Sequence, residues 1–189
     1  MLTAGLALAA FLLGSIPTGV IVSRFRGVDL RKVGSGNIGA TNVGRALGRR
    51  WAVFVLVVDA IKGFAPTFLA TRLDLAPAAV GVAAVLGHVF SVFLKGRGGK
   101  GVATSFGAAL ALAPAAALIC GALYGLVFAC CRISSIGSIT AVLAFPAAMA
   151  VLGDRQPSHY AFAAAVALLV IIRHRDNLRR LARGEENKA

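Results

Sequence analysis

Residues 34–45 read GSGNIGATNVGR, a polar stretch within a chain that is 58% hydrophobic. The stretch combines glycines with Ser35, Asn37, Thr41, Asn42 and the fixed positive charge of Arg45. Glycine lets the backbone approach a ligand closely, and successive backbone N–H groups can form a concave anion site. The stretch therefore predicts a cradle for a phosphate group at a membrane surface.

The remaining composition is typical of an integral membrane protein. The chain has 189 residues, of which 20 are Lys or Arg and 7 are Asp or Glu, and its mean hydropathy is +0.83. Charged residues make up 14% of the chain, whereas about a quarter is usual for a soluble domain. The net charge of +13 does not indicate a nucleic-acid partner, because the basic residues flank apolar segments as in cytoplasmic loops. We predict an all-α, polytopic bundle of transmembrane helices in contact with membrane lipids.

Six apolar segments are near the length of about 20 residues that crosses the hydrocarbon core. They are Ala4–Val22, Trp51–Ala70, Ala76–Phe93, Ser105–Cys131, Ile136–Leu152 and His159–Ile172. Basic residues concentrate in residues 23–50, 95–100 and 173–189. The positive-inside rule therefore places these three regions and the C-terminus in the cytoplasm, and the N-terminus outside.

That orientation requires an odd number of spans. The segment Ser105–Cys131 has 27 residues and contains Pro114 and Gly121, so it can form two short helices. We predict this split and seven spans in total. Five spans, with two segments that only dip into the membrane, are the alternative.

Two glycine-rich stretches match nucleotide-binding patterns but lack their context. GSGNIG fits GxGxxG, yet the acidic residue that follows at the right distance, Asp59, lies in a predicted transmembrane span rather than at the end of a strand. GRGGKG at residues 96–101 has Leu94 where a P-loop needs glycine and Gly101 where it needs Ser or Thr. Neither stretch supports nucleotide binding.

GRGGKG is instead predicted to form a second phosphate site. Lysine supplies a point charge there, and the glycines would let backbone N–H groups converge on an anion. The candidate residues are Lys95, Arg97, Gly98, Gly99, Lys100, Gly101 and Thr104.

The second span contains two ionisable residues, Asp59 and Lys62, three positions apart and so on one helical face. Charged groups facing lipid are costly, so the pair is predicted to face the interior of the bundle. A structural ion pair and a role linked to the substrate both remain open. His88 is interpreted as a core residue, and Phe93 stands where the HxxxxD signature of another acyltransferase superfamily needs aspartate.

Serines and a basic tail add further candidates on the same membrane face. Ser135 and Ser138 open a span after Arg132, either as helix caps or as part of an anion site. The tail, RHRDNLRRLARGEE at residues 173–186, predicts a short amphipathic helix on which His174, Asn177 and Arg180 share a face. Alone, it would be a surface helix that contacts anionic lipid headgroups.

Taken together, GSGNIGATNVGR, GHVFSVFLKGRGGKGVAT and RHRDNLRRLARGEE resemble the three signature motifs of the bacterial acyl-phosphate:glycerol-3-phosphate acyltransferase family, PlsY. GSIP in the first span, DAIKG in the second, and the pair Ser135 and Ser138 extend the resemblance along the whole chain. The chain departs from the family pattern at Ser91, where proline is usual, and at Gly96–Arg97, where an aromatic-Lys pair is common. The family's terminal glutamate aligns best with Glu186.

The resemblance implies a single transmembrane acyltransferase domain over residues 1–189, in the bacterial inner membrane with its active site on the cytoplasmic face. It implies transfer of a fatty acyl group from acyl-phosphate to the sn-1 hydroxyl of glycerol 3-phosphate, which gives lysophosphatidic acid and inorganic phosphate. No cofactor or metal is implied. Functional coupling to an enzyme that forms acyl-phosphate is an expectation.

The resemblance also implies roles for individual residues. The first phosphate would be held by Ser35, Gly36, Asn37, Gly39, Thr41 and Asn42. The second would be held by Arg45, Lys100, Ser135 and Ser138, with His174 and Asn177 closing the site from the tail. Asn37, Lys100 and His174 are the candidate catalytic residues, and Lys95, Gly98, Gly99, Gly101, Thr104 and Arg180 complete the predicted binding set.

Two questions stay open from the sequence. The proton of the attacking hydroxyl can pass to His174, the best side-chain acceptor because imidazole titrates at about 6.5, or to the substrate's own phosphate. The alternative functions are a transporter of a phosphorylated solute and a non-catalytic protein that binds anionic lipid. A transporter predicts polar groups near the bilayer midplane, where this sequence places only Asp59 and Lys62.

Overall fold

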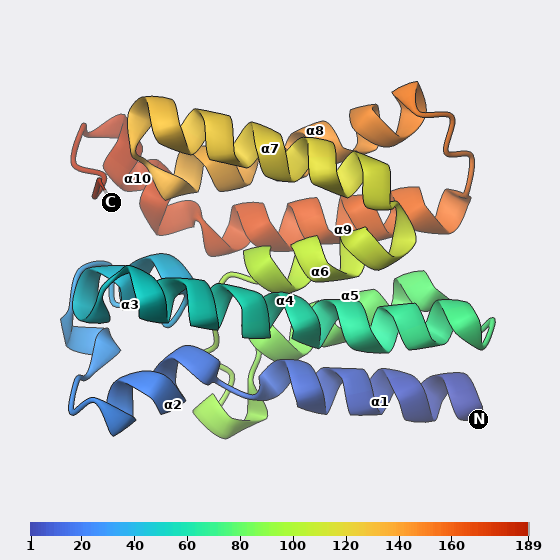
Figure 1. The fold of residues 1–189 in the computed structure, drawn as a ribbon, viewed down its shortest axis with the longest axis horizontal. Coiled ribbons are helices and arrows are strands. Elements are labelled where there is room, and N and C mark those ends of the chain that lie inside the picture. The colour runs from blue at the N-terminus through green and yellow to red at the C-terminus, as the bar shows by residue number, and fades with distance from the viewer. Residues whose placement is uncertain (189) are drawn as a thin grey trace.

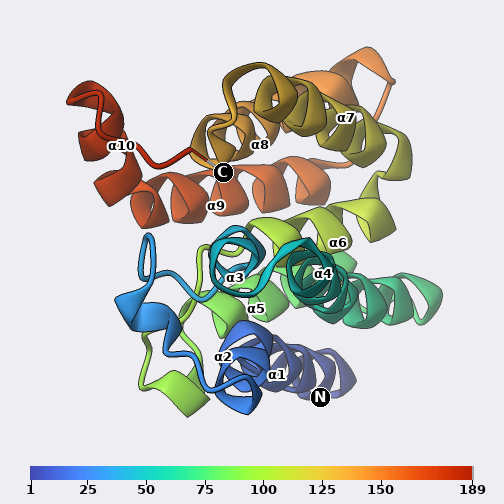
Figure 2. The ribbon, with the colours of Figure 1, turned by 60° about the vertical axis from the view of Figure 1, so that its left-hand side comes forward.

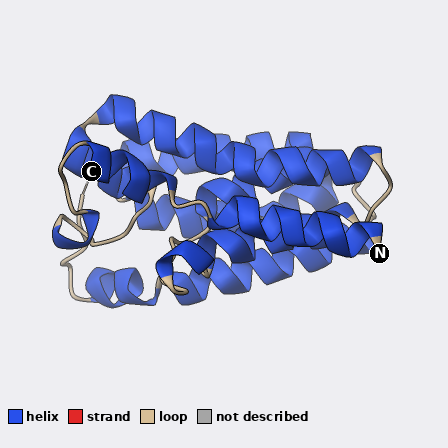
Figure 3. Cartoon of the chain, turned by 90° about the horizontal axis from the view of Figure 1, so that it is seen from below, coloured by secondary structure: helices blue, strands red, loops and turns tan. Residues whose placement is uncertain are grey.

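The computed structural model describes residues 1–188, and these contain helices and loops but no strand (Figure 3). The helices are α1 (Leu2–Ser15), α2 (Thr18–Phe25), α3 (Ala40–Leu47), α4 (Arg49–Arg72), α5 (Pro77–Val89), α6 (Val102–Leu112), α7 (Pro114–Cys131), α8 (Ser134–Val151), α9 (Pro157–Arg173) and α10 (Arg175–Ala182), with 3₁₀ turns η1 (Leu30–Lys32) and η2 (Val92–Leu94).

The long helices lie side by side along one direction, with α2, α3 and α10 at the end opposite the N-terminus (Figure 1). Within the described residues, five segments are long and apolar enough to cross a membrane: Leu2–Phe25, Arg49–Arg72, Pro77–Leu94, Pro114–Cys131 and Ser134–Val151. The pair α9 and α10, bent by 57°, makes a sixth if it is taken as one span. The chain is therefore a multi-pass helical membrane protein, as its composition predicts.

The predicted split of the segment Ser105–Cys131 is confirmed. Helix α6 ends at Leu112, and α7 begins with Pro114 at its first position, where the missing N–H of proline is not needed. Helix α6 begins earlier than expected, at Val102, and its 11 residues rise only about 16 Å. In Figure 2, α6 lies between the α4–α5 layer and the group formed by α7, α8 and α9.

The first apolar segment is broken at Ile16–Pro17, so Ala4–Val22 is not one continuous helix. The carbonyl of Ile16 at this break needs a partner, and the hydroxyl of Ser15 does not supply it, because it donates to Phe11 O and Gly87 O. Lys62 takes that role: its Nζ donates to Ile16 O at 2.6 Å and to Thr18 Oγ1 at 3.0 Å. The break therefore depends on a charged side chain that arrives from α4.

Glycines allow α4 and α6 to pack with their backbones in contact. A Cβ on Gly63 would lie 1.9 Å from Thr104 O, and a Cβ on Gly107 would lie 1.9 Å from Ala60 O. Small residues at such contacts are typical of membrane helices. The contact brings the N-terminal end of α6, and with it Lys100, beside the middle of α4.

Candidate active site

A cavity of about 440 Å³ joins a polar chamber to an apolar arm. The polar chamber is bounded by residues 35–45, Lys100, the start of α8 and the tail. The apolar arm runs between α6, α7, α8 and α9, and its lining includes Phe106, Val142, Phe145, Phe162, Val166 and Val170. Ser135 and Phe145 both line the cavity and are ten residues apart on α8, a separation of about 15 Å.

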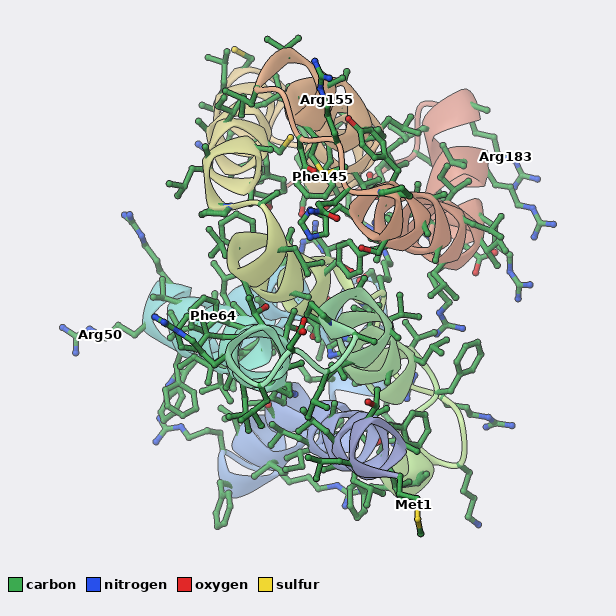
Figure 4. The ribbon with its side chains drawn as sticks, turned by 90° about the vertical axis from the view of Figure 1, so that its right-hand side faces the viewer. Met1, Arg50, Phe64, Phe145, Arg155 and Arg183 are labelled. Carbon is green, nitrogen blue, oxygen red and sulfur yellow. The ribbon has the colours of Figure 1, made fainter. Side chains whose placement is uncertain are left out.

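Figure 4 shows Phe145 inside this group of helices, whereas Phe64 points outward from α4. The Phe145 and Phe162 rings meet edge to face with centroids 6.5 Å apart. The cavity also reaches the outer surface of the bundle, because Leu56 on α4 and Leu118 on α7 line it and are themselves exposed.

Asn42 fixes the shape of the predicted phosphate cradle. Its Nδ2 donates to Leu30 O at 3.2 Å, Val33 O at 3.0 Å and Asn37 O at 2.8 Å. Its Oδ1 accepts the N–H of Ser35 at 3.1 Å. The two N–H donors of the buried amide are thus shared among three carbonyls and its oxygen accepts one N–H, so that Asn42 positions the cradle as well as lining the cavity.

The cradle is joined to the start of α8 through hydroxyl groups. Thr41 Oγ1 lies 3.0 Å from Ser134 Oγ, which is also 3.0 Å from the hydroxyl of Tyr124. Ser134 and Tyr124 were not predicted as site residues, and both line the cavity. The single sequence signal for Ser134 was its place directly before Ser135.

The second group of predicted phosphate-binding residues also meets in the polar chamber. Lys100 Nζ donates to Asn177 Oδ1 at 2.5 Å. Burial lowers the pKa of Lys100 to about 8; Arg180, Arg45 and Arg173 add to this effect, and Glu186 opposes it. Burial likewise lowers the pKa of Arg45. The chamber is thus rich in positive charge that the protein only partly neutralises.

His174 lies just past the end of α9, with 2% of its surface exposed. Its Nδ1 lies 2.7 Å from Val170 O, which requires the proton to be on Nδ1 and leaves Nε2 as an acceptor. Burial, with a contribution from the positive charge of Lys100, lowers the pKa of His174 to about 4. The imidazole is therefore neutral at physiological pH.

Glu186 also belongs to the site. It was not among the predicted site residues, although the family's terminal glutamate aligns with it. Its carboxylate accepts hydrogen bonds from Ser135 Oγ at 3.0 Å, from Asn177 Nδ2, and from Arg180 Nε at 2.7 Å. Burial raises the pKa of Glu186, but these hydrogen bonds outweigh burial and keep the pKa below its usual value. An anionic group is thus already bound by three residues predicted to hold substrate.

Twelve of the predicted site residues line the cavity: Ser35, Asn37, Gly39, Thr41, Asn42, Arg45, Lys100, Gly101, Ser135, Ser138, His174 and Asn177. Six others do not line it: Gly36, Lys95, Gly98, Gly99, Thr104 and Arg180. Lys95 is exposed, Thr104 is buried in the α4–α6 contact, and Arg180 reaches the chamber through Glu186.

The expectation that N–H groups of Gly98 and Gly99 converge on a phosphate is wrong. The N–H of Gly98 donates to Val89 O at 3.0 Å, and that of Gly99 donates to His88 O at 3.1 Å. These glycines serve close packing, because a Cβ on Gly98 would lie 2.0 Å from His88 O. Within the GRGGKG stretch at residues 96–101, Lys100 and Gly101 line the cavity.

Asp59 and Lys62 are buried in the bundle, as predicted, and they form the ion pair that was one of the two open alternatives, with 2.5 Å between Lys62 Nζ and Asp59 Oδ1. Asp59 and His88 also line the cavity. The other polar groups gather around the chamber, at the end of the molecule that carries α3 and α10 (Figure 1).

The fold and the site define a helical membrane protein with a cavity that suits a ligand with both phosphate and a long apolar part. Comparison with known proteins supports this description of the protein. The family model described as "Glycerol-3-phosphate acyltransferase" matches residues 4–184. A relative of that name from Anaeromyxobacter dehalogenans is 50% identical, over 100% of this chain and 98% of its own length. One from Geobacter sulfurreducens is 45% identical, over 97% of this chain and 95% of its own length.

Two solved structures of PlsY, described as an integral membrane glycerol 3-phosphate acyltransferase, have the same fold. The glycerol 3-phosphate form has a TM-score of 0.96 and 39% identity, covering 100% of this chain and 96% of that one. The lysophosphatidic acid form has a TM-score of 0.93 and 38% identity, covering 100% and 95%. The chain belongs to the glycerol-3-phosphate acyltransferase family, which confirms the resemblance seen in its motifs. It is an acyltransferase, and the transporter alternative is excluded.

Proposed function

We propose that the protein transfers a fatty acyl group from acyl-phosphate to the sn-1 hydroxyl of glycerol 3-phosphate, in phospholipid synthesis. The hydroxyl oxygen bonds to the acyl carbon, the bond from that carbon to the phosphate oxygen breaks, and inorganic phosphate leaves. The other product is lysophosphatidic acid. The observation that carries this proposal is the continuity of the polar chamber with the apolar arm, since the acyl chain and both phosphates need such a space.

Within the chamber, the cradle around Ser35, Asn37 and Thr41 suits the phosphate of the acyl donor, at the mouth of the apolar arm. Arg45, Lys100 and Asn177 suit the phosphate of glycerol 3-phosphate. The acyl-phosphate is an activated mixed anhydride, so positioning and charge stabilisation supply the catalysis.

The proton is best accepted by a substrate phosphate. His174, with its pKa near 4, is a weak base, whereas the second pKa of a phosphate ester is about 6 and so closer to the working pH. His174 Nε2 would then orient the glycerol hydroxyl as a hydrogen-bond acceptor.

The same proposal includes the placement in the membrane. Residues 1–189 form one domain in the bacterial inner membrane, with seven passes formed by α1, α4, α5, α6, α7, α8 and α9. These helices run alternately between the two ends of the molecule (Figure 1), and the basic regions share one end, which would face the cytoplasm. Acyl-phosphate would come from a separate enzyme that forms it.

Donor choice tests the proposed function. Purified protein in detergent is given glycerol 3-phosphate with palmitoyl phosphate, or with palmitoyl-CoA in a parallel reaction, and lysophosphatidic acid and phosphate are followed. We expect product from palmitoyl phosphate alone, because the cradle holds a phosphate leaving group and the small chamber does not suit a coenzyme A moiety. Product from the thioester alone, or from neither donor with a protein that still unfolds cooperatively, contradicts the proposal.

The pKa of Lys100 predicts an alkaline limit to activity. The ammonium group is protonated below about pH 8 and loses its charge above it, so kcat/KM for glycerol 3-phosphate should fall as the pH rises through that value. In the Lys100→Arg variant this decline should be absent, whatever the absolute rate, because arginine keeps its charge. Initial rates measured from about pH 6 to about pH 10, a range that brackets this titration, provide the measurement. An identical alkaline limb in both proteins would rule out Lys100 as its origin.

A further inference from the structure

Lys100 lies in a loop without regular secondary structure, yet it must place its Nζ within the polar chamber. The loop backbone is held on one side by α5, through the hydrogen bonds from Gly98 N to Val89 O and from Gly99 N to His88 O. On the other side, the guanidinium of Arg173 donates to Gly99 O through Nε and to Gly98 O through Nη2, both at 3.2 Å. The two residues before Lys100 are thus fixed from opposite directions.

The imidazole of His88 completes this support. A Cβ on Gly99 would lie 2.2 Å from His88 Nε2, so the ring packs directly against the backbone of Gly99. His88 Nδ1 lies 4.0 Å from Asp59 Oδ2 on α4, and its side chain is 7% exposed. The ring is therefore placed between a buried carboxylate and the loop that carries Lys100.

Asp59 is held in turn by Lys62, and Lys62 is held by the break between α1 and α2. The Lys62 ammonium contacts Asp59 Oδ1, Ile16 O and Thr18 Oγ1, which satisfies its three donors. A buried ion pair gives little net stability, because desolvation costs about as much as the attraction returns. The ion pair instead fixes the relative positions of α1, α4 and α5 around His88.

We propose that His88 and Arg173 are positioning residues that hold the Gly98–Gly99 backbone so that Lys100 binds the phosphate of glycerol 3-phosphate, with Asp59 and Lys62 anchoring His88. This inference rests on the proposed role of Lys100 in the function above. His88 lines the cavity, but its ring packs against the backbone of Gly99 and acts on Lys100 through the loop, whereas Arg173 lies outside the cavity lining.

A double-mutant cycle on the binding of glycerol 3-phosphate tests this. The dissociation constant is measured by titration calorimetry for the wild type, His88→Ala, Lys100→Ala and the double variant. His88→Ala should weaken binding by about tenfold when Lys100 is present and by less than about twofold when it is absent, because residues that act as one unit are not additive. The KM for palmitoyl phosphate should stay unchanged in His88→Ala, which a general loss of structure would not allow.

Val80→Ala is the matched control, since Val80 is fully buried on the same helix, far from the loop. It should lower the midpoint of thermal unfolding without changing the dissociation constant. If His88→Ala fails to unfold cooperatively, Arg173→Met takes its place in the cycle with the same expected result. Equal weakening by the positioning variant in both Lys100 backgrounds overturns the inference and leaves the proposed function standing. An unchanged dissociation constant in Lys100→Ala refutes the role of Lys100, and the inference with it.

Discussion

Replacing Lys100 with alanine should lower kcat/KM for glycerol 3-phosphate by about a thousandfold while the protein remains folded. The reason is that Lys100 supplies a partly desolvated positive charge inside the chamber, where its Nζ contacts Asn177 Oδ1. Charged groups aimed at a reacting phosphate in such sites contribute about 10²–10³-fold each, and the loss of phosphate binding adds to this. Steady-state rates with palmitoyl phosphate, together with thermal unfolding in detergent, provide the measurement.

Arg50→Ala is the control for a simple change in net charge. Arg50 is an exposed cation (Figure 4) on α4 that does not line the cavity. Its replacement should change the rate by less than about twofold, because exposed charges act weakly through solvent. If Lys100→Ala and Arg50→Ala lose activity to the same extent, the effect comes from overall charge and the assignment of Lys100 fails.

Replacing Asn42 with alanine should reduce both stability and activity. The substitution removes the donor shared by Leu30 O, Val33 O and Asn37 O, and the acceptor for the N–H of Ser35. Each buried group left without a partner costs about 1–3 kcal/mol. Because the exposed part of the loop can regain water, we expect a loss of about 2–4 kcal/mol in the free energy of unfolding. The KM for acyl-phosphate should rise as the cradle loses its shape.

Chemical denaturation in detergent and donor kinetics measure the two effects. Thr71→Ala serves as the comparison, because Thr71 makes a single hydrogen bond, to Thr67 O at 3.1 Å, in an exposed position on α4. It should cost less than about 1 kcal/mol and leave the KM unchanged. A variant of Asn42 that behaves like Thr71→Ala would show that the cradle is stable without the amide.

Local properties of the sequence predicted much of the architecture. Apolar segments identified the helices, Pro114 marked the boundary between α6 and α7, and the charges of Asp59 and Lys62 within an apolar segment predicted that both face the interior of the bundle. Of the site, residues 35–45 and Lys100 could be predicted because polar, glycine-rich and basic stretches stand out within an apolar chain. His174 was predicted from the resemblance of the tail to a family motif.

The features that the sequence did not predict depend on contacts between distant segments. No local signal shows that Gly98 and Gly99 give their N–H groups to α5, since this requires the packing of that helix against the loop. The capping of the break at Pro17 by Lys62 joins residues 46 positions apart. The return of Glu186 to Ser135 spans 51 positions and depends on the bend between α9 and α10.

The cavity reaches the outer surface of the bundle beside Leu56 and Leu118, which are exposed where lipid would surround the protein. For the proposed reaction, a fatty acyl donor can enter sideways from the leaflet, and the lipid product can return by the same route, without either chain crossing water. The enzyme would then sense its donor as a fraction of the surrounding lipid rather than as a concentration in solution. Its rate in vesicles would follow the surface density of acyl-phosphate, so that diluting the donor with inert lipid slows turnover even when the total amount of donor is constant.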